Sequence, residues 1–129
     1  MFAMVLLVFF IGIVEIKARI SAVKSKEISP KYFRLMQGYE APEAITRSTR
    51  CFNNQFEIPL LFYVACTLYL ALNIESKLGL ITAWLFVGFR YIHAYIHLTY
   101  NHILHRMYTF WFAFISVMVL WVNLVIHQI

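Results

Sequence analysis

The chain has 129 residues, of which 62% are hydrophobic and only 13% are charged. Soluble domains average about 45–50% apolar and about 25% charged residues, so this composition excludes an ordinary soluble domain and indicates a single integral membrane unit. The formal net charge of +5 comes without a soluble basic domain that could hold a nucleic acid. We therefore expect no nucleic-acid partner, and we expect membrane lipid around the chain.

Hydropathy predicts an all-α protein with four membrane-spanning helices in one domain, residues 1–129. The spans cover about residues 2–20, 44–72, 78–100 and 106–126. A span needs about 20 residues to cross a hydrocarbon core of about 30 Å. The apolar run from Leu78 to Phe89 is shorter than that, so the third helix must continue beyond Arg90. This arginine is therefore expected inside the membrane.

The positive charges predict the orientation. The segment from Lys17 to Arg50 holds eight of the 11 Lys and Arg residues. By the positive-inside rule the first loop is cytoplasmic, as is the turn from His102 to Arg106, and both termini lie on the opposite side. A bacterial inner membrane suits this small chain.

Two polar stretches interrupt the hydrophobic sequence. Projected on an ideal helix, the polar residues of the first stretch fall within roughly 80° of one another around the helix axis, and those of the second within roughly 100°. The first contains Arg47, Arg50, Asn54 and Glu57; the second contains Arg90, His93, His97, Tyr100 and Asn101. Ionisable groups at membrane depth usually face a bundle interior or a wet cavity. The arginines and the glutamate could pair across helices, and Arg50, Arg90 and Arg106 could line an anion site. A purely structural role in helix association stays open.

A proline, two cysteines and a group of histidines give three further expectations. Pro59 predicts a kink in the second helix. Cys51 and Cys66 lie too far apart on that helix for a disulfide. The histidines near the end of the third helix raise a metal or quinone-type redox hypothesis, because His93 and His97 stand at i and i+4. His102 and His105 follow in the next turn, but no Cys or Asp is close in the sequence, and we expect no metal.

The pattern Arg47-x-x-Arg50-x-x-x-Asn54-x-x-Glu57-x-Pro59 resembles the second-helix signature of the MAPEG family, the membrane-associated proteins in eicosanoid and glutathione metabolism. Arg90-x-x-His93 in the third helix and Arg106 in the fourth follow in the expected order. The length, the four spans and the basic first loop are similar to those of small bacterial-type members.

This resemblance implies an up-down four-helix bundle that assembles as a homotrimer, with glutathione as co-substrate between subunits. The resemblance implies that Arg50, Asn54 and Glu57 hold glutathione, while Arg90 and His93 line or support the site. His97 stands where the family has a tyrosine and is included with them. Arg106 matches the family arginine that stabilises the glutathione thiolate.

Two main functions stay open. One is a glutathione-dependent transferase or peroxidase acting on lipophilic substrates. The other is a non-catalytic protein that binds lipid or serves as an accessory subunit of a larger membrane complex. Three departures from the family pattern favour the second. Asn53 stands where glutathione-using members often carry another arginine, and Met107 and Phe110 stand where prostaglandin-type members carry a hydroxyl residue.

Overall fold

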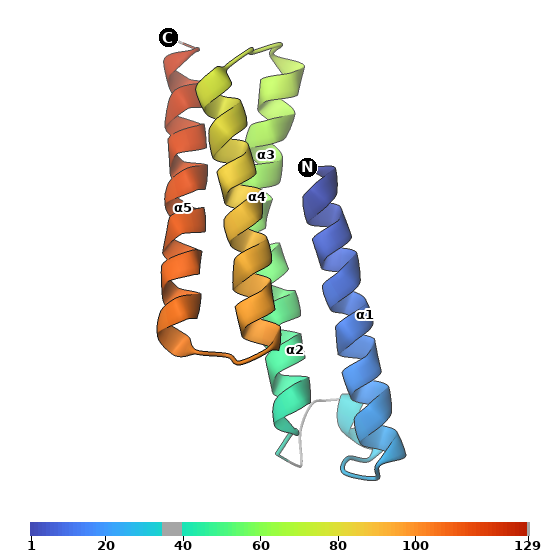
Figure 1. Ribbon diagram of the computed structural model, residues 1–129. Coiled ribbons are helices and arrows are strands. Elements are labelled where there is room, and N and C mark those ends of the chain that lie inside the picture. Colours follow the sequence, from blue (N-terminus) through green and yellow to red (C-terminus); the bar gives the residue numbers. More distant parts are fainter. Residues whose placement is uncertain (35–39, 129) are drawn as a thin grey trace.

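The computed structural model describes residues 1–34 and 40–128, and this part of the chain is helical without strands. Its α-helices are α1 (Phe2–Lys24), α2 (Glu43–Asn53), α3 (Ile58–Ala71), α4 (Lys77–Leu98) and α5 (Ile103–Ile126). They run alongside one another, with α2 and α3 following end to end (Figure 1). The predicted all-α class is confirmed.

The continuous helix expected over residues 44–72 is interrupted. After α2 the chain forms a 3₁₀ turn over Asn54–Phe56, and Glu57 then leaves the helical region with φ −96° and ψ −103°. Pro59 occupies the first turn of α3. A proline lacks an N–H, and its ring collides with the carbonyl four residues earlier, here that of Gln55. The kink predicted at Pro59 is therefore a break just before it.

Helices α4 and α5 form a long antiparallel pair. Ser76 caps α4 by accepting a hydrogen bond from the Gly79 N–H (3.1 Å), and the turn after α4 places Asn101 at φ 50°. Asparagine tolerates this left-handed conformation better than most residues. Among the described residues, α4 and α5 are the two helices long and apolar enough to cross a membrane by length and composition.

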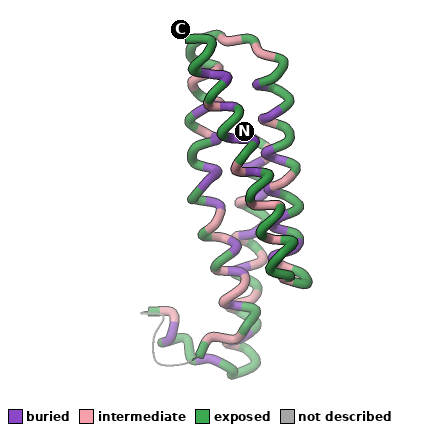
Figure 2. Tube along the Cα trace, turned by 90° about the vertical axis from the view of Figure 1, so that its left-hand side faces the viewer, coloured by how far each residue is buried: buried purple, intermediate pink, exposed green. Residues whose placement is uncertain are grey.

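The main core lies between the helices. Met4 and Ile11 enter it from α1, and the rings of Phe62 and Phe86 stack there with centroids 4.5 Å apart. Buried and exposed stretches alternate along each helix (Figure 2). The outward positions are themselves apolar, for example Phe9, which is 68% exposed. Large apolar side chains on the outside suit a surface covered by lipid or by other copies.

A second, smaller core lies where the first loop joins α1 and α2. This loop cluster consists of Ala22, Ile28, Tyr32 and Ile45, all of them buried. It fastens the start of the loop to α2 at the basic end of the molecule.

Candidate functional site

Arg90 occupies the centre of the predicted site and is fully buried. Its Nη2 donates to the backbone oxygen of Asn54 at 2.7 Å. In an unbroken α-helix that oxygen would accept from the N–H of Ile58, so the break before α3 makes it available to Arg90. The other two guanidinium nitrogens, Nε and Nη1, have no partner among the described residues. Arg90 therefore ties α4 to the junction of α2 and α3.

His93 and His97 lie on the same side of α4 and are also buried. The Nδ1 of His93 lies 3.1 Å from the backbone oxygen of Arg106. A carbonyl oxygen only accepts, so Nδ1 carries the proton and Nε2 is left as an acceptor. Within the described chain, His93 Nε2 and both ring nitrogens of His97 have no partner. The two rings are 5.9 Å apart.

Further arginines join this region from the neighbouring helices. The Nη1 of Arg106 donates to the side-chain oxygen of Asn101 at 2.8 Å. Arg47 donates to the backbone oxygen of Thr99, also at 2.8 Å, at the carboxyl end of α4. Arg50 follows Arg47 by three residues on α2 and is exposed.

We call the four arginines Arg47, Arg50, Arg90 and Arg106 the cation cluster, and the rings of His93 and His97 lie on the same helix as Arg90. The four arginines come from α2, α4 and α5. A group of guanidinium ions attracts anions, and its planar forks suit carboxylates. The cluster lies at the end of the helices that carries the α4–α5 turn.

The predicted site residues occupy two different environments. Arg90, His93 and His97 are buried inside the chain, whereas Arg50 and Glu57 are exposed on the α2–α3 segment. Asn54 and Arg106 are half-buried between the two groups. One chain therefore divides the predicted residues between its interior and its surface.

The expected Arg–Glu pair across helices is wrong for a single chain. The salt bridge in the described residues lies within α1, between Arg19 and Glu15. Glu57 precedes α3 at an exposed position, and Arg90 uses a backbone carbonyl in its place. The broken helix explains the difference, because it offers Arg90 an acceptor without a second charge.

A polar link between α1 and α2 was not predicted from the sequence. Glu15 is buried, and it accepts hydrogen bonds from Arg19 and from Thr49 at 3.0 Å. A glutamate four residues before an arginine on a helix is the signal that could have identified the first part of this link. Gln55 was also missed; it is buried and donates to the Cys51 carbonyl at 3.0 Å.

The histidines and cysteines do not gather into a metal centre in the described residues. No group of three or more His, Cys, Asp and Glu side chains there could hold an ion. His102 and His105 form a separate exposed pair with ring centroids 4.5 Å apart. Cys51 and Cys66 are free thiols, as their spacing predicted.

Comparison with known proteins gives one result that covers almost the whole chain. The model of the MAPEG family matches residues 1–126. No curated protein and no solved structure matches the chain significantly. The family match and the two apolar helices together indicate a membrane protein. With 126 of 129 residues matched, the chain belongs to the MAPEG family.

Proposed function

We propose that this protein is a homotrimer of up-down four-helix bundles that binds glutathione between its subunits. In this proposal it transfers glutathione to lipophilic electrophiles, or reduces lipophilic hydroperoxides, in a bacterial inner membrane. The basic first loop is cytoplasmic and the two ends of the chain lie on the opposite side.

One observation carries the proposal: α2 and the turn after it expose polar side chains at the cation cluster. Arg50, Asn53 and Glu57 are exposed there, and Asn54 and Arg106 are half-buried. Charged groups at membrane depth are costly in contact with lipid. A second copy packed on this face would cover them and would enclose a polar site at the boundary.

The chemistry of these groups suits glutathione, which carries two carboxylates, one ammonium group and a thiol. Arg50 would pair with a carboxylate, Asn54 would hydrogen-bond the peptide, and Glu57 would accept from the ammonium group. A thiol must lose its proton before it attacks, and a neighbouring cation stabilises the thiolate. Arg106 would supply that cation, while the buried Arg90, His93 and His97 would support the site from inside.

Calorimetric titration of the purified trimer with glutathione, in detergent, tests this proposal. We expect saturable binding by the native protein and a thiolate absorbance in the ultraviolet. Arg106→Gln should lose the absorbance, and Lys77→Gln, which removes a cation at the other end of α4, should retain it. The absence of binding at millimolar glutathione would refute the enzyme hypothesis.

The burial of half the predicted ligands favours a second candidate function. Arg90, His93 and His97 reach no surface of the single chain. Phe110 lies against His93, with ring centroids 6.2 Å apart, and Met107 is exposed and apolar. In a non-catalytic lipid-binding protein or accessory subunit, these groups would only hold the helices together. Such a protein would form the trimer and yet bind no glutathione.

A further inference from the structure

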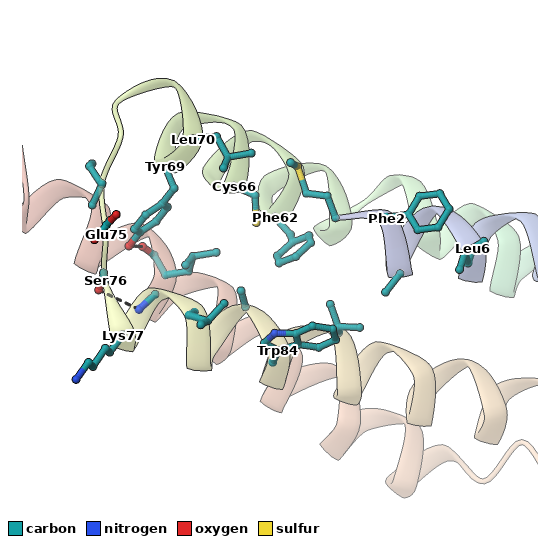
Figure 3. A pocket seen from close by; sticks show the side chains of 18 residues that line it. Phe2, Leu6, Phe62, Cys66, Tyr69, Leu70, Glu75, Ser76, Lys77 and Trp84 are labelled. Atoms are coloured by element: carbon teal, nitrogen blue, oxygen red, sulfur yellow. Dashed lines mark hydrogen bonds between the residues drawn. The ribbon is translucent and has the colours of Figure 1, made fainter.

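An open groove of about 920 Å³ lies between α3 and α4, with the first residues of α1 at one end (Figure 3). Its walls are mainly apolar; Phe62 and Leu70 contribute from α3, and Leu80 and Trp84 from α4. Figure 3 shows Glu75 and Lys77 at the other end of the groove. Two charged side chains therefore lie at this end, which we call the mouth, and Met1 is also among the lining residues.

The α3–α4 turn is hydrogen-bonded to α5 beside the groove. The hydroxyls of Tyr69 and Ser76 each donate to the side-chain oxygen of Asn123, at 2.7 Å in both cases. Gly79 allows the Tyr69 ring to approach, since a Cβ at this glycine would lie 3.0 Å from it. Tyr69, Ser76 and Gly79 all line the groove, so these contacts shape its end at the turn.

The length of the groove along α4 is similar to the thickness of the hydrocarbon layer of one bilayer leaflet. Along α4 it extends from Lys77 to Val87. Ten residues of α-helix rise about 15 Å. The hydrocarbon core of a bilayer is about 30 Å thick, so this length is half of it. With the α3–α4 turn at headgroup level, a groove of this length would end near the middle of the membrane.

The mouth carries one charge of each sign. Glu75 and Lys77 are both exposed, and neither forms a salt bridge within the described part of the chain. A phosphodiester would pair with the lysine and a primary ammonium group with the glutamate. A purely anionic lipid would be repelled by Glu75, and an apolar segment of another copy would leave both charges uncompensated.

We propose that this groove binds one acyl chain of a zwitterionic aminophospholipid, with its phosphate at Lys77 and its ammonium group at Glu75. The site lies at the opposite end of α4 from the cation cluster. It therefore goes beyond the proposed glutathione chemistry and does not depend on it.

Native mass spectrometry of the delipidated full-length protein tests the acyl-chain part. The probe is palmitoyl-oleoyl phosphatidylethanolamine. We expect one bound lipid per chain. Ala83→Phe, which fills the groove, should bind roughly tenfold more weakly because acyl methylenes lose their buried contacts. Ala71→Phe is the matched control, since Ala71 is exposed on α3 outside the groove, and it should bind as the native chain does.

The headgroup part is tested with phosphatidylglycerol of the same acyl chains. The native protein should prefer phosphatidylethanolamine by roughly threefold to fivefold, the size expected from exposed ion pairs. The double variant Glu75→Gln/Lys77→Gln should lose this preference, and it keeps the test available if Ala83→Phe does not fold. Equal binding of the two lipids by the native protein would overturn the proposal. The proposal would also be overturned if Ala83→Phe had a lower oligomeric mass but bound as much lipid as the native protein. That result would mean that another copy of the chain, and not a lipid, occupies the groove.

Discussion

Arg90 shows how a permanent charge can be accommodated in a hydrophobic interior. An isolated buried charge is very unfavourable unless it is hydrogen-bonded or paired. Here one nitrogen reaches the carbonyl that the helix break leaves open, at 2.7 Å. The bond joins α4 to the junction of α2 and α3, and so the position of Arg90 depends on the conformation of Asn54.

Replacement of Arg90 by alanine should lower the free energy of unfolding by about 2–5 kcal/mol, because a fully buried side chain is replaced by a cavity and the Asn54 carbonyl loses its donor. Unfolding by sodium dodecyl sulfate in mixed micelles would measure this change. Arg34→Ala removes an exposed arginine and should alter stability by less than about 0.5 kcal/mol. Equal losses in the two variants would contradict the structural role of Arg90.

Glu15 offers a second test at the residue scale. We expect Glu15→Ala to destabilise the protein by about 1–3 kcal/mol, since it removes the acceptor of both Arg19 and Thr49. The exposed Glu27 provides the matched control. Thermal unfolding in detergent should separate the two variants, and an unchanged transition for Glu15→Ala would show that the link between α1 and α2 is dispensable.

At the scale of elements, the break between α2 and α3 organises the predicted site. It ends α2 at Asn53 and lets α3 begin at Ile58. In a continuous helix, the Asn54 carbonyl would accept a hydrogen bond from the Ile58 N–H and would not be available to Arg90. The polar end of α2 therefore has an orientation that the spacing of its residues, projected on an ideal helix, could not predict.

Pro59→Ala should allow the helix to continue through residues 54–58. Each restored helical hydrogen bond contributes about 1 kcal/mol, so amide hydrogen exchange there should slow by roughly fivefold. Exchange measured by mass spectrometry would show this, with Leu60→Ala as a control that leaves the proline in place. Unchanged exchange in Pro59→Ala would mean that Arg90, and not the proline, maintains the break.

At the scale of the whole molecule, Asn123 joins three helices through one amide oxygen. Tyr69 and Ser76 donate to it from both sides of the α3–α4 turn. Both hydrogen bonds are part-buried. Asn123 therefore links α5 to the end of α3 and to the residue that caps α4.

Asn123→Ala should lower the unfolding free energy by about 1–3 kcal/mol, because two part-buried hydroxyls lose their acceptor. Ser116→Ala is a suitable comparison on the same helix, since the Ser116 hydroxyl donates only to the Phe112 carbonyl of α5 itself. Detergent unfolding of both variants would measure the difference. A larger loss for Ser116→Ala than for Asn123→Ala would contradict the role assigned to Asn123.

The parts of the fold that follow from local pattern were predictable, and those that depend on tertiary contacts were not. Long apolar runs gave α4 and α5, and the position of Pro59 indicated an irregular second helix. The partner of Arg90 was not predictable, because backbone carbonyls carry no sequence signal. Projection on an ideal helix also could not show that Arg50 faces outward while Arg90 faces inward.

The order of synthesis has a consequence for biogenesis. Among the described helices, α4 and α5 are the two that are both long and apolar enough to cross a bilayer, and their short turn makes their contacts local. Local contacts form fastest. Yet α1, α2 and α3 leave the ribosome first, before the arginine that holds the Asn54 carbonyl has been synthesised. We expect the first half of the chain to wait in a loosely inserted form, vulnerable to membrane proteases, until the last hairpin arrives.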